Sequence, residues 1–318
     1  MPKEKGLQYY PIALFASVMG FAGLTIASKH AENIFGWNHW VWAVFLTITS
    51  LLFILNGSIL IYRLIRFKPM VQNEFHHPVK MNFFGTIPIS LLLLAVSYFE
   101  ISQSVSFILW FAGAILQISL TLAIMSNLIF KHAFEITHFN AAWFIPIVGN
   151  IIVPIAGVNF IPKDVNWVFF SIGVLFSIIY LTFFFNRVFF HPASPQMLLP
   201  TFFILLAPPA IGFVSYIKMS GAVDAFAYIL YGTAFFIGLL LVVQWQRFIQ
   251  LPFMVSFWAF LFPSAAMTVA TGELFVATNL TAYQILFVIQ FIALVLLGFY
   301  LLVKTIQLAF TGKLCLKD

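Results

Sequence analysis

Charged residues are scarce in this chain. They make up 8% of its 318 residues, against about 25% in a soluble domain. Cysteine is scarcer still, because Cys315 stands alone, which excludes an internal disulfide and a cysteine-based metal cluster. Hydrophobic residues instead account for 63% of the sequence, including 41 phenylalanines. A water-soluble core does not bury so much apolar side chain, so the composition predicts an integral membrane protein.

Uncharged stretches long enough to cross a membrane recur along the whole chain. Because a charge near the bilayer centre is costly, we interpret each stretch as a membrane-spanning helix of about 20 residues. They lack the alternating polarity of barrel strands. The ten stretches are residues 6–28, 33–62, 81–99, 101–130, 136–162, 165–186, 188–217, 225–246, 248–272 and 274–303. The sequence therefore predicts an all-α integral membrane protein with one transmembrane domain over residues 1–318 and short tails.

The distribution of lysine and arginine predicts the orientation. If the N-terminus lies inside, all of the fifteen basic residues except Lys29, Lys163 and Lys218 fall on the inner side. Cytoplasmic loops carry such an excess of lysine and arginine. We expect a multi-pass protein of the cell (inner) membrane with both termini in the cytoplasm. The basic residues are sorted by side rather than clustered, so nucleic acid is not an expected partner.

The first stretch is longer than a signal-peptide core and lacks a convincing cleavage site, so we interpret it as a membrane span rather than a cleaved signal peptide.

Among the ten stretches, the odd-numbered ones carry proline in their interiors and the even-numbered ones do not. A proline inside a helix frees a carbonyl four residues earlier and kinks the helix. Irregular backbone at membrane depth is tolerated where protein buries it or where it lines a cavity. We therefore predict five helical hairpins, with the odd helices as an inner pore ring and the even helices as an outer ring. An inverted repeat fits less well, because its paired helices differ in proline content. The prolines are Pro11, Pro88, Pro146, Pro154, Pro200, Pro208, Pro209 and Pro263.

Titratable groups are missing from the interiors of the stretches. Coupled transporters usually need such groups to carry a proton or ion, so their absence favours a channel. No phosphate-binding loop or nucleophile motif is present, so we predict no enzyme activity and no cofactor. Glu100 and Glu273 are expected as solvated carboxylates at the outer boundary, and the pair at His76 and His77 is weak support for a metal site. Among polar residues, Asn150 is the candidate to face the axis; Asn56, Gln117, Asn127 and Gln290 are expected to bond helix to helix.

Several motifs together resemble the tellurite-resistance (TehA-type) and plant slow-anion-channel family, which includes C4-dicarboxylate, malate and sulfite transporters. They occur in the family's order from the first stretch to the ninth. Phe15 and Gly20 have the family's spacing in the first stretch. The others are HPVKMNFF at residues 77–84, PIVGN at 146–150, APPA at 207–210 and WAFLFP at 258–263.

The resemblance implies a homotrimer in which the odd helices of each subunit line its own pore. It also implies that Phe262, directly before Pro263, is the gate, since an aromatic ring in a narrow pore stops ions by dewetting. Further candidates for lining or kinking the pore are Phe15, Gly20, Pro88, Pro146, Gly149, Asn150, Pro208, Pro209 and Pro263. The expected function is a passive channel for small monovalent anions such as nitrate and chloride. The alternative is a secondary transporter for dicarboxylate, sulfite or tellurite, possibly coupled to protons.

Overall fold

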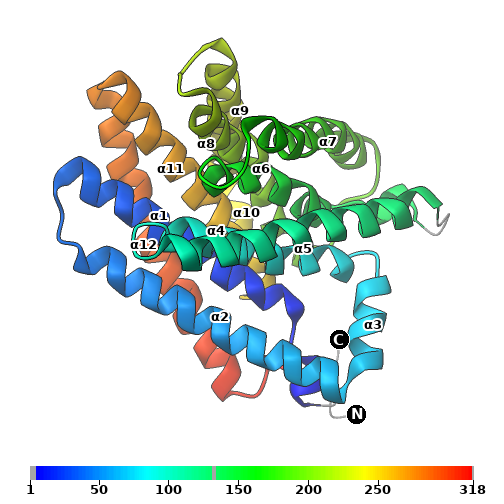
Figure 1. The fold of residues 1–318 in the computed structure, drawn as a ribbon. Helices are drawn as coiled ribbons and strands as arrows, with labels where there is room; N and C mark the ends of the chain where they lie inside the picture. Colours follow the sequence, from blue (N-terminus) through cyan, green and yellow to red (C-terminus); the bar gives the residue numbers. More distant parts are fainter. Residues whose placement is uncertain (1–4, 131–133, 317–318) are drawn as a thin grey trace.

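The computed structural model describes residues 5–130 and 134–316, and within them the regular secondary structure is helical (Figure 1). Nine helical segments of the described chain are long and apolar enough to cross a membrane. A further apolar segment, Ala141–Gly157, is shorter. The nine are Ile12–Phe35, Trp40–Arg66, Lys80–Tyr98, Gln103–Phe130, Lys163–Phe190, Gln196–Ser220, Ala225–Val243, Val255–Thr278 and Thr281–Phe310. The expectation of an all-helical, multi-pass membrane protein is confirmed.

Five of the segments begin as a 3-10 helix and continue as an α-helix, and we call them the two-part segments. They are η2 (Ile12–Leu14) with α1 (Phe15–Phe35), η3 (Lys80–Gly85) with α4 (Thr86–Tyr98), η5 (Ala141–Phe144) with α6 (Ile145–Gly157), η6 (Gln196–Leu206) with α8 (Ala207–Ser220), and η7 (Val255–Phe260) with α11 (Leu261–Thr278). These segments contain the prolines that the sequence placed in the odd stretches, apart from Pro11, which directly precedes η2.

The other five long helices are α-helical throughout. They are α2 (Trp40–Arg66), α5 (Gln103–Phe130), α7 (Lys163–Phe190), α9 (Ala225–Val243) and α12 (Thr281–Phe310). The remaining elements are short: η1 (Leu7–Tyr9), α3 (Lys68–His76), η4 (Ile136–His138) and α10 (Trp245–Ile249).

Proline marks the junction between the two parts of a segment. Pro88, Pro146, Pro208 and Pro263 all lie in the first turn of an α-helix. Each of these α-helices continues directly from a 3-10 helix, so the proline removes one N–H donor where the hydrogen-bond pattern changes from i→i−3 to i→i−4. These prolines therefore accompany a change of helix type rather than a kink in mid-helix, while Pro154 lies inside α6.

Burial differs sharply between the two kinds of segment. Over an 18-residue apolar stretch of each segment, 72% to 78% of the residues are buried in the four longer two-part segments, but only 22% to 33% in the uninterrupted helices. All residues of α6 are buried except Ile155. Because lipid-facing side chains count as exposed, the uninterrupted helices present their apolar surface outward and the two-part segments are covered by protein.

The contacts of the two-part segments form a closed series. Helix α1 packs against α4, α4 against α6, α6 against α8, α8 against α11, and α11 against α1. Each of these helices also packs against the uninterrupted helix that follows it in the chain. Figure 1 shows α2, α5, α7 and α9 at the outside of this arrangement.

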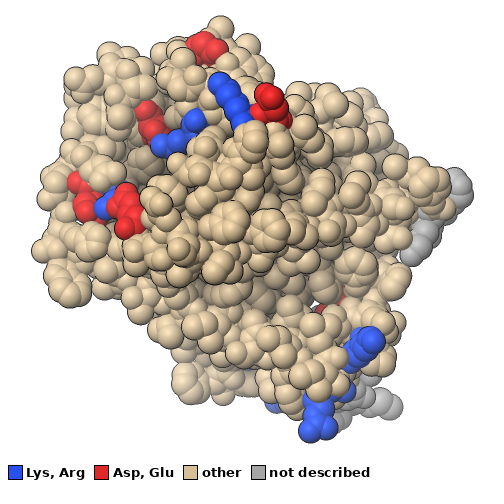
Figure 2. Space-filling view, in the orientation of Figure 1, with Lys and Arg blue, Asp and Glu red and all other residues tan. Residues whose placement is uncertain are grey.

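The two described ends of the chain lie together. Lys5 forms an isolated β-bridge with Leu316, and the Gly6 N–H donates to the Cys315 carbonyl at 3.2 Å (Figure 1). The buried Arg63 guanidinium fixes this region, because it pairs with Glu74 at 2.9 Å and donates to the Gln8 carbonyl. Figure 2 shows charged side chains at opposite ends of the molecule with a broad uncharged band between them, as expected for a membrane protein.

Candidate functional site

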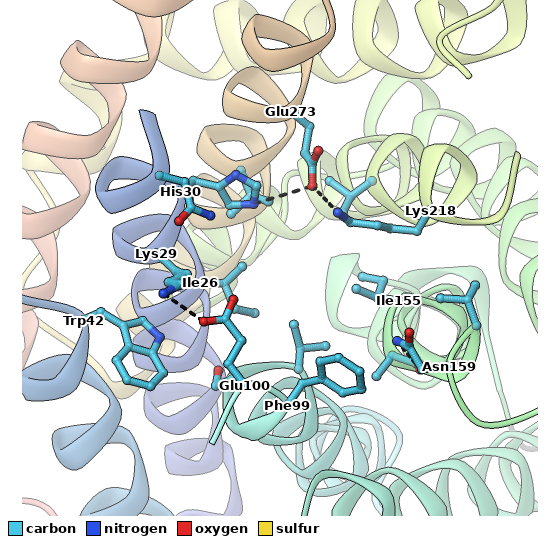
Figure 3. Close-up of a pocket in the computed structure, with 17 residues that line it drawn as sticks. Ile26, Lys29, His30, Trp42, Phe99, Glu100, Ile155, Asn159, Lys218 and Glu273 are labelled. Carbon is cyan, nitrogen blue, oxygen red and sulfur yellow. Dashed lines mark hydrogen bonds and ion pairs between the residues drawn. The ribbon is translucent and has the colours of Figure 1, made fainter. Parts of the chain in front are cut away.

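Two cavities lie among the same five two-part segments. The wide cavity has a volume of about 350 Å³ and is lined from α1, α4, α6, α8 and α11, with Trp42 of α2 and residues just after α4 and α6 (Figure 3). The narrow cavity has a volume of about 30 Å³ and takes its lining from the same five segments, nearer their 3-10 parts. A cavity of about 30 Å³ holds on the order of one water molecule, so the narrow cavity is nearly closed.

The linings of the two cavities are in register. On every one of the five helices, a residue that lines the narrow cavity is followed seven positions later by one that lines the wide cavity. Seven residues make two helical turns, about 10 Å along the axis, so each pair lies on one helix face. The pairs are Met19 and Ile26, Ile89 and Val96, Val148 and Ile155, Ala207 and Val214, and Phe262 and Val269. The two cavities therefore lie on a common line between the five helices.

A set of buried apolar residues lies between the two cavity linings in the sequence of each of the five helices. It contains the residues one turn after those of the narrow cavity, namely Gly23, Leu93, Ile152, Ile211 and Ala266, all of them buried and outside the lining of both cavities. We call this set the apolar layer. Sequence reasoning missed it, because leucine and isoleucine are too common in membrane helices to single out individual positions.

Phe262 lies at the narrow-cavity side of the apolar layer. Its side chain is 5% exposed and lines the narrow cavity together with Trp258, Ala259 and Pro263. The ring lies close to α1 at Gly23: a Cβ on Gly23 would lie 3.5 Å from Phe262 Cδ2 and only 2.6 Å from the Ala265 Cβ. Glycine at position 23 thus lets α1 approach both the ring and the backbone of α11.

Four of the expected pore residues make contacts between helices and lie outside the lining of both cavities. Phe15 packs edge-on against Phe53 of α2, with ring centroids 6.3 Å apart. A Cβ on Gly20 would lie 2.6 Å from a Leu261 side-chain atom, so Gly20 permits the close packing of α1 and α11. Gly149 and Asn150 lie against Gln117 and Thr121 of α5.

A buried polar network joins α5 to the start of α6. The Pro146 carbonyl accepts from Gln117 Nε2 at 2.6 Å and from Thr121 Oγ1 at 2.8 Å. Asn150 Nδ2 donates to Thr121 Oγ1 at 2.9 Å. A Cβ on Gly149 would lie 2.2 Å from Gln117 Oε1, so only glycine leaves room for the glutamine. The expectation that Gln117 bonds helix to helix is confirmed, and the Asn150 amide bonds in the same direction, toward α5.

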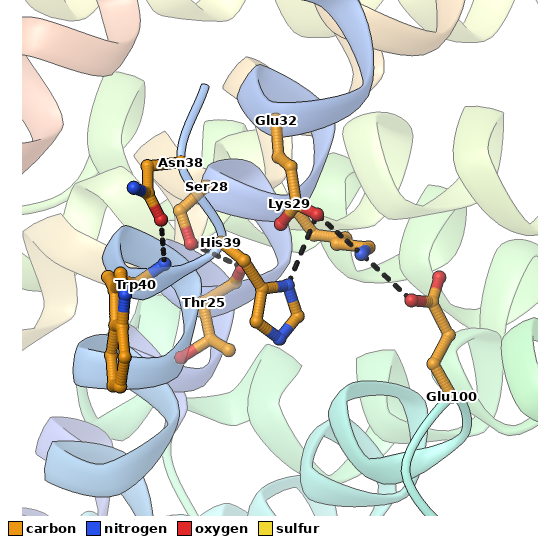
Figure 4. Close-up of polar contacts among 8 residues, drawn as sticks. All are labelled: Thr25, Ser28, Lys29, Glu32, Asn38, His39, Trp40 and Glu100. Carbon is orange, nitrogen blue, oxygen red and sulfur yellow. Dashed lines mark hydrogen bonds and ion pairs between the residues drawn. The ribbon is translucent and has the colours of Figure 1, made fainter. Parts of the chain in front are cut away.

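Two ion-pair groups lie at the wide cavity. Lys29 contacts Glu100 at 2.8 Å and Glu32 at 3.1 Å (Figures 3 and 4). Lys218 of α8 contacts Glu273 of α11 at 2.8 Å, and His30 Nε2 lies 3.6 Å from the same carboxylate (Figure 3). The second group joins α1, α8 and α11, three of the five helices around the cavity.

The structure corrects the expectation for Glu273. Glu100 is 59% exposed, in keeping with a solvated carboxylate, but Glu273 is only 12% exposed and lines the cavity. Glu273 follows Phe262 by eleven residues, which is three helical turns, so both lie on the same face of α11. That spacing is the signal in the sequence that places Glu273 at the cavity. Among the described residues, no three His, Cys, Asp or Glu side chains lie close enough to hold a metal ion.

Comparisons with known proteins identify relatives over nearly the full chain. Residues 9–306 match the family SLAC1, described as voltage-dependent anion channel. The S-type anion channel SLAH3 of Arabidopsis thaliana is 25% identical over 320 residues, which cover 98% of this chain but only 50% of that protein. The uncharacterized transporter MJ0762 of Methanocaldococcus jannaschii is 24% identical over 94% of this chain and 95% of that protein.

A bacterial relative fits the same pattern. The tellurite resistance protein TehA homolog of Haemophilus influenzae is 26% identical over 259 residues, which cover 81% of this chain and 79% of that protein. The resemblance first seen in the motifs of the odd stretches is therefore confirmed. The match to the family extends from just before η2 almost to the end of α12, and with it the chain belongs to the voltage-dependent anion channel family.

Proposed function

We propose that this protein is a passive anion channel whose pore runs along the line of the two cavities. In this proposal ten helices cross the membrane as five hairpins, with α1, α4, α6, α8 and α11 around the pore and the uninterrupted helices outside. The observation that carries it is the register of the two cavities on all five two-part segments. The closed series of contacts and the contrast in burial support the same arrangement.

The short segment with α6 fits this proposal as a tenth crossing. A 3-10 helix rises about 2.0 Å per residue and an α-helix about 1.5 Å. The four residues of η5 and the thirteen of α6 together cover about 27 Å at those rises, close to the ~30 Å hydrocarbon thickness of a bilayer.

In our proposal Phe262 is the gate. An ion that passes from the wide to the narrow cavity must cross the apolar layer and then pass the Phe262 ring, and neither offers polar groups to replace its hydration water. A dewetted apolar constriction of this kind blocks ions without any charged group. Conduction therefore requires the Phe262 ring to move away from Gly23, toward which it now extends.

Selection among anions follows from the same lining. Ring edges and the backbone amides of the irregular helices offer only a weak positive potential. The free energy of dehydrating each anion then determines how easily it passes. Nitrate gives up its water readily, so we expect it to pass more easily than chloride. Reversal potentials measured with the sodium salts of both anions test this order, and a strict preference for the smaller ion would contradict it.

A coupled transporter is the alternative, and the group of His30, Lys218 and Glu273 favours it. These side chains give the wide cavity a titratable cluster. Coupling predicts that anion uptake into liposomes changes the internal pH in fixed proportion to the flux. The channel predicts anion current that follows the applied potential with no proton movement. A pH-sensitive dye recorded beside the anion flux separates the two.

The gate is tested by voltage clamp of Phe262→Ala beside wild type. Removal of the ring should raise anion conductance at least tenfold, which corresponds to ~1.4 kcal/mol off the barrier. Phe213→Ala is the matched control, because Phe213 is also buried but packs on Tyr231 of α9, with centroids 5.6 Å apart. Equal currents in the wild type and Phe262→Ala would show that the ring only fills space.

We also propose a homotrimer in the inner membrane with both termini in the cytoplasm. Native mass spectrometry of the detergent-solubilised protein should give three copies. For the orientation, Cys315 should react with an impermeant maleimide only after cells are opened. Leu280→Cys in a Cys315→Ser background should react in intact cells, since Leu280 is exposed at the loop between α11 and α12.

A further inference from the structure

A large groove lies between α2 and α12, separate from the two cavities of the pore line. Its volume is about 560 Å³, within the range of ~300–1,000 Å³ that is usual for ligand pockets. Its sides are apolar, and both flanking helices are membrane-spanning by length and composition. The side residues are Leu52, Leu55 and Ile59 of α2 with Leu302, Ile306 and Ala309 of α12. The groove therefore lies at the depth where lipid chains meet the protein.

The polar groups on the floor of the groove are already bonded within the protein. The Tyr10 hydroxyl donates to Asn56 Oδ1 at 2.9 Å. Trp258 Nε1 donates to Thr305 Oγ1 at 2.9 Å, and that hydroxyl donates to the Leu301 carbonyl at 2.8 Å. An occupant of the groove thus meets apolar sides and a floor with its hydrogen bonds satisfied, which suits a hydrocarbon chain.

A positive charge lies at the end of the groove near the chain termini. Lys5 contributes to the lining, and its ammonium lies beside Gly312, at 3.6 Å from where a Cβ would be. Figure 2 shows other lysine and arginine side chains at the end of the molecule near the termini, as well as at the opposite end. Lysine and arginine at the membrane surface attract anionic lipid headgroups.

We propose that the groove binds an anionic phospholipid from the leaflet nearest the termini. One acyl chain lies between α2 and α12, and the phosphate lies at Lys5. The combination of an apolar trough at membrane depth with a lysine at its surface end matches such a lipid and no hydrophilic ligand.

Trp258 couples this site to the pore line. Its side chain is 1% exposed and lines both the groove and the narrow cavity. The indole therefore forms the wall between them, one helical turn before Phe262. Movement of the indole toward the groove would enlarge the narrow cavity below the gate. A bound acyl chain fills the space for that movement and keeps the indole at Thr305, so the lipid favours the closed pore. This regulatory step depends on the proposed channel function, whereas the binding site itself does not.

Fluorescence quenching tests the binding site. The protein is reconstituted in phosphatidylcholine vesicles that contain a minor fraction of either brominated phosphatidylglycerol or brominated phosphatidylcholine. The emission of Trp258 is the part of the fluorescence that is lost in Trp258→Phe. We expect brominated phosphatidylglycerol to quench at least twice as much of this emission as brominated phosphatidylcholine does. Lys5→Gln and Ile306→Phe should at least halve this difference.

Two matched controls should leave the quenching unchanged. Lys304→Gln removes a lysine of α12 that lies outside the groove lining, and Val303→Phe enlarges a side chain that is 51% exposed, close to the 45% of Ile306. Equal quenching by the two lipids, or equal effects of the groove and control variants, would overturn the site. So would a change in subunit number for Ile306→Phe with unaltered quenching, since the groove would then be a subunit contact.

Anion flux from the same vesicles tests the regulation. Wild type should conduct at least twofold faster without phosphatidylglycerol, and Lys5→Gln should lose that difference. Selective binding with no effect of the lipid on flux would overturn the regulatory step alone. Absence of flux in every lipid and at every potential would overturn the channel, while the quenching result would still decide the site.

Discussion

Gly23 offers a sharp test of how closely α1 and α11 must pack. In Gly23→Ala the new methyl carbon would lie 2.6 Å from the Ala265 Cβ, whereas carbon atoms in contact prefer about 3.5–4.0 Å. Both are first side-chain atoms, so no rotamer relieves the clash and the helix backbones must separate by about 1 Å. Such overpacking costs typically ~1–3 kcal/mol. The same methyl contacts Phe262, so the displacement should also loosen the gate.

The control for this prediction is Gly57→Ala on α2. A Cβ there meets no heavy atom within 4 Å, and alanine in a helix is more stable than glycine by roughly 0.5–1 kcal/mol. Thermal unfolding in one detergent, followed by tryptophan fluorescence, should give a lower midpoint for Gly23→Ala and an equal or higher one for Gly57→Ala. Anion conductance should rise only in Gly23→Ala. Equal midpoints for the two variants would refute the argument for close packing.

Three further predictions concern polar groups. Glu273→Gln should raise anion entry at low salt, because Lys218 loses its counter-charge in the wide cavity, and conductance that stays the same at low and high salt would contradict this. Gln117→Leu should cost about 1–2 kcal/mol in unfolding experiments, because the carbonyl at the start of α6 loses a donor, and an unchanged stability would show that Thr121 alone suffices. The hydrogen bond from Tyr216 and those from the first turn of α9 lower the pKa of Asp224 in the folded protein. The ionised carboxylate therefore stabilises the fold above the ordinary aspartate pKa of about 4. This stabilisation is lost as the pH falls through the lower pKa of the folded state. Asp224→Ala should therefore lower the melting temperature at pH 7 and have little effect at the acid end of the titration.

Charge spacing predicted where helices lie better than where they end. A long uncharged segment in a membrane forms a helix, because a helix satisfies the backbone hydrogen bonds within the segment. The odd and even stretches accordingly correspond to helical segments. The stretch 33–62 became α2 over Trp40–Arg66, four residues past its expected end. The reason is Arg63, which is buried and neutralised by Glu74 at the helix end, so the charge does not stop the helix.

The sequence did not predict which way the side chains of the two-part segments point. Asn150 was expected to face the axis because of its place between two prolines, yet it donates to Thr121 on α5. Gly149 makes room for Gln117 on that side, and the Pro146 carbonyl accepts from Gln117 and Thr121 there. The periodicity of α6 does not reveal this, because nearly all of its residues are apolar and buried. Only the register of several helices together distinguishes the inward face.

The division of η7 and α11 has a mechanical consequence. Trp258 belongs to the 3-10 part and Phe262 to the α part. Each residue that passes from 3-10 to α geometry shortens the segment by about 0.5 Å and turns the residues before it by about 20°. A shift of the boundary along the segment therefore couples a rotation to a change in length. A shift of this boundary would rotate Trp258 relative to Phe262, because the two residues lie on opposite sides of it.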